Sequence, residues 1–272
     1  MLIPFGTLAS SGGVVPVTVR FAVIAGGGGS PHGKGGAGGF RKSFASELSG
    51  GGAPSESPLI IISGASVQVT VGAGASTAPA NGSPSTFGTV TSLGGGAGGG
   101  TSGNNGASGA SGGSGGGGGG AVPPPNSPGG GGAGTAGQGF AGGFGGTGGY
   151  NAVVVGSDEY GNYIIDYQPY RGEGGAGGGA SSSGTPGNNT GGPRTPGAGL
   201  ATSIRGSSET FASGNTASAP NTGNSGQSGI VIVRYPSAST INIGAGLTGT
   251  TTTVASDKVT TFTAGTGNIT FS

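Results

Sequence analysis

The 272-residue chain has no cysteine, no tryptophan and one histidine, and only 6% of its residues are charged. The lack of cysteine excludes disulfides and thiol chemistry. Nucleophilic catalysis needs a base beside its nucleophile, and His32 stands in a Gly-Ser-Pro loop without an orienting carboxylate. We expect His32 to be a solvated loop residue. These shortages predict a protein that is not an enzyme and that holds no cofactor and no metal ion.

Acidic residues are also few, and four of them, Asp158, Glu159, Asp166 and Glu173, are the candidates for an acid pair that hydrolyses sugars. No pattern favours that reaction. The formal net charge of +1 is too small to steer a charged partner, so no nucleic-acid partner is expected. The longest apolar stretch, residues 14–25, is broken by a proline and an arginine, which predicts no membrane insertion. The first residues lack the basic start and apolar core of a signal peptide, so Sec export is not expected.

Glycine is abundant instead, with 74 glycines and 17 prolines in the chain. Such a composition without a fixed period is typical of low complexity. Disordered chains, however, usually carry a high net charge that keeps them open, and this chain does not. We therefore expect an ordered structure, and the order has to come from the glycine backbone itself.

Polyglycine II geometry suits such a backbone. Ordering one glycine costs on the order of 1–2 kcal/mol and returns no side-chain area, so hydrogen bonds and close backbone approach must compensate. The polyproline II type of helix has three residues per turn and directs its backbone groups outward, toward neighbouring helices. Collagen needs glycine at every third position, and runs such as 115–120 and 129–132 have no such period. The prediction is a bundle of polyglycine II-type helices with essentially no α-helix.

Strand-like segments bracket the glycine-rich stretch. Period-two alternation predicts strands at residues 17–25 and 66–71, and a further strand is expected at 229–235. The short apolar run 59–62 is expected to be buried on both faces. The fold class is thus all-β and irregular.

The composition changes after Pro236, where threonine and isoleucine replace glycine. We predict two units: a glycine-rich domain over residues 1–236 and a small β module over 237–272. The strands expected in the module are 240–243, 251–254, 259–263 and 268–271.

A predicted strand runs into GGSPHGKG at residues 28–35, which matches the G-x-x-x-x-G-K pattern of a phosphate-binding loop. Gly35 stands where a Ser or Thr would hold magnesium, and more glycines follow where a helix should begin. Chance matches are frequent in a chain with this much glycine. We therefore do not predict nucleotide binding.

The segment 150–171 concentrates five of the six tyrosines and three of the eight acids. Residues 153–155 and 163–167 are expected to form a hairpin around the turn GSDEYGN. One interpretation is an apolar cluster that caps the glycine bundle or contacts another subunit. The other is a recognition loop, because Tyr among Gly, Asn and Ser gives contact area at low entropic cost. The candidate receptor- or partner-binding residues are Tyr150, Asp158, Tyr160, Tyr163, Tyr167, Tyr170 and Arg171, with Asp158 and Arg171 at the rim.

Five segments occur in an order that resembles a known phage domain: AVIAGGGGS (22–30), VQVTVGAGAS (67–76), GTAGQGFAGGFGG (134–146), GGPRTPGAGLATSIRGSSETF (191–211) and GQSGIVIVRYP (226–236). Together they resemble the glycine-rich domain of tail-fibre and adhesin proteins of tailed phages, abundant in cyanophages. VTTFTAGTGNITF (259–271) looks like the hairpin module that accompanies it. The resemblance implies a rigid polyglycine II core with variable loops that bind host receptors.

The expected function is that of a virion structural protein, a tail-fibre or tail-tip adhesin subunit that contacts a host cell-surface receptor. Its other expected partners are virion subunits, including copies of itself in a homotrimer, because open strand edges accept partners. The alternative is a capsid decoration or head-fibre protein without receptor binding, in which the tyrosine segment packs against a neighbour. A third class, an extracellular coat or ice-binding protein, needs a longer regular threonine array than residues 250–253 supply.

Overall fold

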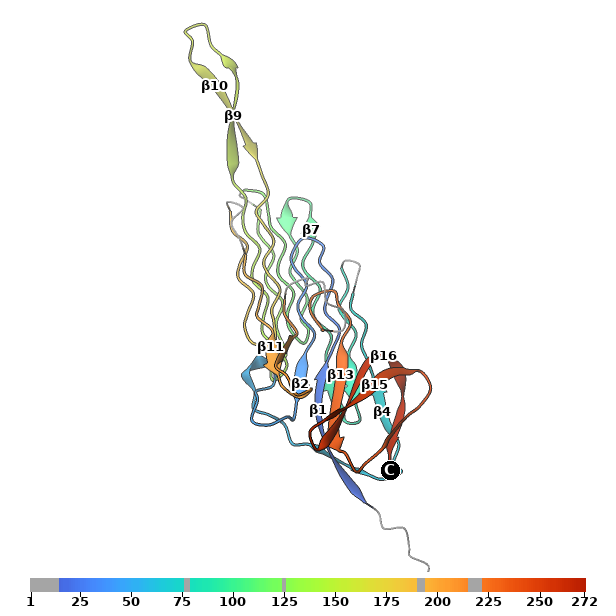
Figure 1. Cartoon of the computed structure of the whole chain (residues 1–272). Coiled ribbons are helices and arrows are strands. Elements are labelled where there is room, and N and C mark those ends of the chain that lie inside the picture. The colour runs from blue at the N-terminus through green and yellow to red at the C-terminus, as the bar shows by residue number, and fades with distance from the viewer. Residues whose placement is uncertain (1–14, 76–78, 124–125, 190–193, 215–221) are drawn as a thin grey trace, which may run out of the picture.

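The computed structural model describes residues 15–75, 79–123, 126–189, 194–214 and 222–272. The molecule is elongated, with a curled β-sheet at one end, a shaft of extended glycine-rich segments in the middle, and a single hairpin at the other end (Figure 1). The described residues contain sixteen strands, one short 3-10 turn at Gly50–Gly52 and no α-helix. The prediction of an all-β chain without α-helix is confirmed.

The main sheet nearly closes into a barrel. Its strands follow the order β2-β1-β13-β16-β4-β5-β6, and β3 (Leu59–Ile62), β14 (Ile241–Ile243) and β15 (Leu247–Val254) pair with members of this path. The bounds are β1 Pro16–Ile24, β2 Phe40–Lys42, β4 Val67–Thr70, β5 Ser85–Phe87, β6 Val90–Ser92, β13 Ile230–Pro236 and β16 Asp257–Phe271. Three shorter hairpin pairs lie outside it: β7 Thr101–Ser102 with β8 Asn105–Gly106, β9 Tyr150–Ser157 with β10 Tyr163–Pro169, and β11 Leu200–Thr202 with β12 Glu209–Phe211.

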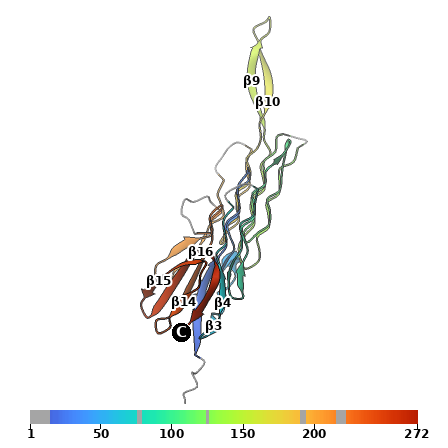
Figure 2. The ribbon, with the colours of Figure 1, turned by 90° about the vertical axis from the view of Figure 1, so that its right-hand side faces the viewer.

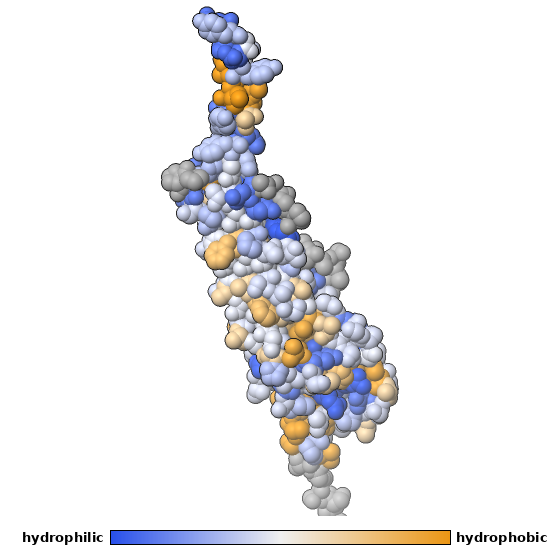
Figure 3. Space-filling view, turned by 90° about the vertical axis from the view of Figure 1, so that its left-hand side faces the viewer, coloured by the Kyte–Doolittle hydropathy of each residue, from blue (hydrophilic) through white to orange (hydrophobic). Residues whose placement is uncertain are grey.

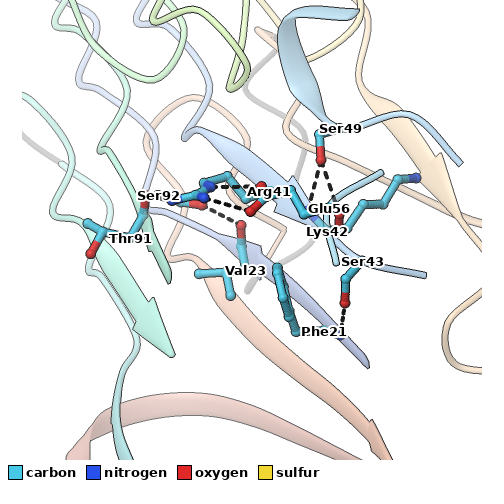
Figure 4. Close-up of polar contacts among 9 residues, drawn as sticks. All are labelled: Phe21, Val23, Arg41, Lys42, Ser43, Ser49, Glu56, Thr91 and Ser92. Atoms are coloured by element: carbon cyan, nitrogen blue, oxygen red, sulfur yellow. Dashed lines mark hydrogen bonds and ion pairs between the residues drawn. The ribbon is translucent and has the colours of Figure 1, made fainter. Parts of the chain in front are cut away.

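Polar contacts join the two ends of this path (Figure 4). The Ser92 hydroxyl of β6 donates to the carbonyl of Val23 in β1 at 2.7 Å. Arg41 of β2 donates to the carbonyl of Thr91 and forms a two-point ion pair with Glu56. These contacts hold β6 against β1 and β2, which bends the sheet around its apolar interior.

The predicted strands at 17–25 and 229–235 are confirmed as β1 and β13, which pair antiparallel with Val23 opposite Val231. Odd-numbered β1 residues such as Phe21 and Val23 are buried in the barrel interior, as the alternation indicates. Ala22 and Ile24 are buried too, in a second cluster on the other face of the sheet, with Phe40 among their neighbours. The sheet is thus covered on both faces at its centre.

The predicted strands 59–62 and 66–71 are also confirmed, as β3 (Leu59–Ile62) and β4. The expectation that β3 is buried on both faces is wrong. Only Ile61 is buried, while Ile60 and Ile62 are exposed. The reason is position, because among the described residues β3 pairs only with the first residues of β1, and it lies at an edge of the sheet.

The C-terminal stretch contributes β14 (Ile241–Ile243), β15 (Leu247–Val254) and β16. The strands expected at 259–263 and 268–271 are parts of the single strand β16, which pairs with β13 and β15 along its first half and with β4 and β14 along its second. Phe262 and Phe271 of β16 lie in the same core as Phe21. The division of the chain at residue 236 stays a prediction, with one sheet spanning it.

The shaft consists of extended segments that run side by side along its length (Figure 2). Its centre is the buried segment 114–121. Every third N–H of this segment donates to the same neighbour: amides 115, 118 and 121 to segment 140–146, amides 116 and 119 to segment 107–110, and amides 114 and 117 to segment 34–37.

The carbonyls of the central segment follow the same repeat with three other neighbours. Carbonyls 114 and 117 accept from segment 96–99, carbonyls 116 and 119 from segment 129–132, and carbonyls 115, 118 and 121 from segment 172–178. Six segments therefore surround this one. A Cβ added to any glycine from 115 to 120 would lie 1.8–2.1 Å from a neighbouring carbonyl oxygen, so no side chain fits there.

Candidate binding hairpin

The hairpin of β9 and β10 is the feature that the tyrosine-rich segment builds, and it projects beyond the shaft at the end opposite the sheet (Figure 1). The expected strands at 153–155 and 163–167 are confirmed and extend further toward the shaft. Pairing runs from Ser157 opposite Tyr163 to Tyr150 opposite Pro169, with an irregularity between Ile164 and Ile165.

Asp158 shapes the turn of this hairpin. Its carboxylate accepts from the backbone N–H groups of Tyr160 and Asn162 at 2.9 and 2.8 Å and from the Asn162 side chain at 3.0 Å. These hydrogen bonds, first of all that of the Asn162 side chain, lower the pKa of Asp158. Gly161 supplies the left-handed conformation that the turn needs, with φ of 82°. The Asp158 carboxylate therefore stabilises the turn, and the turn leaves Tyr160 exposed.

The tyrosine rings are exposed. Tyr160 is 82% and Tyr163 74% exposed, and Tyr150 and Tyr167 are also largely open. Every residue of β9 and β10 is exposed. Within a single chain the segment thus forms no apolar cap on the shaft. Contact with another subunit and receptor recognition both remain consistent with this exposure.

An apolar band lies between the polar turn and the base of the hairpin (Figure 3). We call it the apolar waist, and it comprises Val153, Val154, Val155, Ile164 and Ile165, each 43–58% exposed. Val154 and Ile165 are opposite each other and share one face. Val153 and Ile164 point to the other face, because each is next in its strand to Val154 or Ile165 and successive side chains alternate. Val155 is the extra residue of β9 at the irregularity. The consecutive apolar runs VVV and II are the signal in the sequence for this two-sided character.

Tyr170 and Arg171 lie at the base of the hairpin and are partly buried, and their side chains bond within the chain, so their part in a contact surface stays a prediction. The Tyr170 hydroxyl donates to the Asn189 carbonyl at 2.8 Å. The Arg171 guanidinium donates to the carbonyls of Gly103 at 2.6 Å and Gly120 at 2.8 Å, and to those of Asn104 and Asn105 at longer distance. Arg171 thus ties the hairpin to the β7–β8 loop and to the central shaft segment.

His32 lies beside this anchor and is partly buried, so the expectation of a solvated loop histidine is wrong. Its Nδ1 accepts from the Gly120 N–H at 3.3 Å. Burial, and next the nearby charges of Arg171 and Arg194, lower the pKa of His32, while Glu173 opposes them. The neutral ring therefore takes the place of a carbonyl acceptor in the shaft's pattern.

The glycine loop at residues 28–35 is engaged inside the shaft. The N–H groups of Gly28, Gly33 and Lys34 donate to carbonyls of other shaft segments, and that of Gly35 donates to the Ser30 hydroxyl. A phosphate would need those donors. Among the described residues, no three His, Asp or Glu side chains group closely enough to hold a metal ion.

A shallow groove of about 410 Å³ lies on the side of the shaft. Backbone and small side chains line it, among them Pro79, Asn81, Thr101 and Ser108, and no ionisable group takes part. In the described part of the chain, no helix is long and apolar enough to cross a membrane.

Comparisons of this chain with protein-family models, with curated proteins and with solved structures find no match.

Proposed function

We propose that the chain is a virion structural protein of a tailed phage, a tail-fibre or tail-tip adhesin subunit. In this proposal the sheet end attaches to other virion proteins, the shaft is a rigid spacer, and the hairpin contacts a receptor on the host cell. The order of glycine-rich motifs described above, including the terminal GIVIVRY, supports the phage origin.

We propose further that the shaft is a bundle of polyglycine II helices. The three-residue repeat of donors and acceptors in segment 114–121 supports this, because a helix with three residues per turn directs every third group to the same neighbour. Six neighbours saturate the backbone groups in directions that a β-ladder, with two neighbours, cannot serve. Such a network makes a spacer that resists bending without a large apolar core.

The placement of the hairpin carries the adhesin proposal. Exposed tyrosines and a carboxylate-fixed turn stand at the free end of a rigid shaft, as far as the fold allows from the sheet. Tyrosine rings lose little entropy on contact and offer both an apolar face and a hydroxyl, which suits recognition. Arg171 fixes the direction of the hairpin, so the contact surface is preorganised.

The alternative is a capsid decoration or head-fibre protein without receptor binding. The apolar waist favours this alternative, because its exposed side chains would be covered if a neighbouring virion chain packed on them. In that case the tyrosine segment is a subunit contact.

Binding of the purified chain to cells of hosts on which the parent phage grows tests the proposal. We compare the native chain with a variant in which Tyr160, Tyr163 and Tyr167 are replaced by Ala, and with a Phe144→Ala control that removes an exposed ring elsewhere on the surface. The proposal predicts that the native chain and the control bind and that the folded triple variant does not. Absence of native binding to every such host would favour the decoration protein.

A further inference from the structure

The apolar waist specifies what kind of surface the hairpin meets. Two-stranded hairpins are marginal in water on their own, and this one exposes valine or isoleucine on both of its faces. A flat partner would cover one face and leave the other in water. A concave site covers both, as when a long recognition loop inserts into a cleft.

The edges of the hairpin also favour a partner with a complementary surface. In the described part of the chain, β9 and β10 pair only with each other, so each strand has an outer edge of unpaired N–H and C=O groups. Backbone of a partner protein can add to such an edge, with main-chain hydrogen bonds that give affinity. Sugar hydroxyls have no comparable regular pattern, and they do not cover valine and isoleucine.

The negative charge of the hairpin favours a partner site with a basic rim. Residues 150–170 contain Asp158, Glu159 and Asp166 and no Lys, Arg or His, giving the hairpin a formal charge of −3 in a chain whose total is +1. Anionic polysaccharides and anionic lipid surfaces are repelled by this charge. A basic rim complements it and steers the encounter.

We infer that the hairpin inserts into a concave apolar site with a basic rim on a protein at the host surface. The inference rests on the proposed adhesin function and names the chemical class of its receptor. The site is open at both ends. Its walls cover both faces of the waist, and the turn with Asp158 and Glu159, which lies beyond the waist, reaches the basic rim at the far end. Tyr160 and Tyr163 lie on the turn side of the walls, and Tyr150 and Tyr167 on the base side.

Cell-binding measurements with the labelled full chain test the receptor class. Host cells are treated with a protease that shaves surface proteins, or with periodate that oxidises surface sugars. The inference predicts that protease abolishes binding, that periodate leaves it unchanged, and that raising the salt concentration weakens it. Binding that survives protease and is lost after periodate overturns the inference while leaving the adhesin function intact. Absence of binding to untreated cells overturns both.

Two single substitutions test the concave fit. Val153→Thr and Val154→Thr keep shape and β-propensity but add a hydroxyl on opposite faces of the hairpin. Both are expected to weaken binding roughly tenfold, because each places an unpaired hydroxyl in a dry contact. Val15→Thr, at an exposed valine near the sheet end, is the matched control and is expected to bind like the native chain. An effect from only one of the two faces would contradict insertion into a concave site.

Discussion

Adding one methyl group at Gly118 would disrupt the packing of the shaft. A Cβ there would lie 2.0 Å from the Gly129 carbonyl oxygen, and backbone cannot move aside as a flexible side chain can. Gly100, in the same shaft, has open space where its Cβ would be. Packing thus requires glycine at Gly118, whereas Gly100 has room for a side chain.

We expect Gly118→Ala to lower the free energy of unfolding by about 2–4 kcal/mol and Gly100→Ala to change it by less than about 0.5 kcal/mol. Chemical denaturation followed by circular dichroism measures both. Equal effects at the two positions would show that close backbone packing does not hold the shaft together.

Lys42, the most buried cation among the ion pairs of the described residues, pairs with Glu47. The Lys42 side chain is 0% exposed, and its Nζ donates to Glu47 at 3.0 Å and to the Ala201 carbonyl at 2.7 Å. Burial alone would raise the pKa of Glu47, but hydrogen bonds from Ser203, Thr202 and Lys42 outweigh it and lower that pKa from 4.5 to about 2. Burial lowers the pKa of Lys42 although Glu47 opposes this. The carboxylate thus connects β2 to the β11 region.

A carboxyl whose pKa is lower in the folded than in the unfolded state stabilises the fold above the unfolded value, and this stability is lost as pH falls through the folded value. We therefore expect Glu47 to contribute on the order of 3 kcal/mol at most, lost between pH 4.5 and about 2. Glu47→Gln should lower stability at neutral pH and flatten the acid limb of the stability curve. Glu159→Gln, in the exposed turn, is the control. An unchanged acid limb in Glu47→Gln would contradict the role given to this carboxylate.

At the scale of elements, the hairpin adds exposed surface and contributes little to the free energy of unfolding. All residues of β9 and β10 are exposed, whereas the anchors Tyr170 and Arg171 belong to the shaft end. Asn151 and Gln168 are paired opposite each other. A variant in which residues 152–167 are replaced by Asn-Gly therefore joins the two strands by a two-residue turn.

This deletion is expected to change the free energy of unfolding by less than about 1 kcal/mol, or a few degrees in Tm. It is also expected to raise solubility, since it removes the apolar waist. Calorimetry and the concentration at which the protein aggregates provide the two readouts. A large loss of Tm would mean that the hairpin stabilises the shaft, as the cap interpretation holds.

The longer strands are predictable from sequence because alternation in segments such as 17–25 reflects a local period. The three-residue strands β2, β5 and β6 are not, since FRK, STF and VTS carry too few residues for a period. The sequence locates the tyrosine hairpin but not its anchor, because the acceptors of Arg171 are backbone carbonyls far away in the chain. Which glycine segments become neighbours is equally hidden, because the segments resemble one another.

At the scale of the whole molecule, the two ends have opposite roles in the proposed function. The sheet end contains the main apolar core and both described chain ends, residues 15 and 272. The shaft keeps the hairpin far from that end with a backbone network and few side chains. A rigid spacer with a preorganised tip is the arrangement expected of an attachment protein.

The most direct test places the hairpin in the virion. Because the chain has no cysteine, Glu159→Cys creates the one site in this chain for a maleimide gold label, at the exposed turn, and unmodified phage gives the background from thiols of other virion proteins. Parent phage carrying this variant is labelled intact and imaged by electron microscopy. If the proposed function holds, gold is expected at the outer ends of the tail fibres or at the tail tip. Gold distributed over the head, or a cysteine that the reagent cannot reach in the assembled particle, would contradict it.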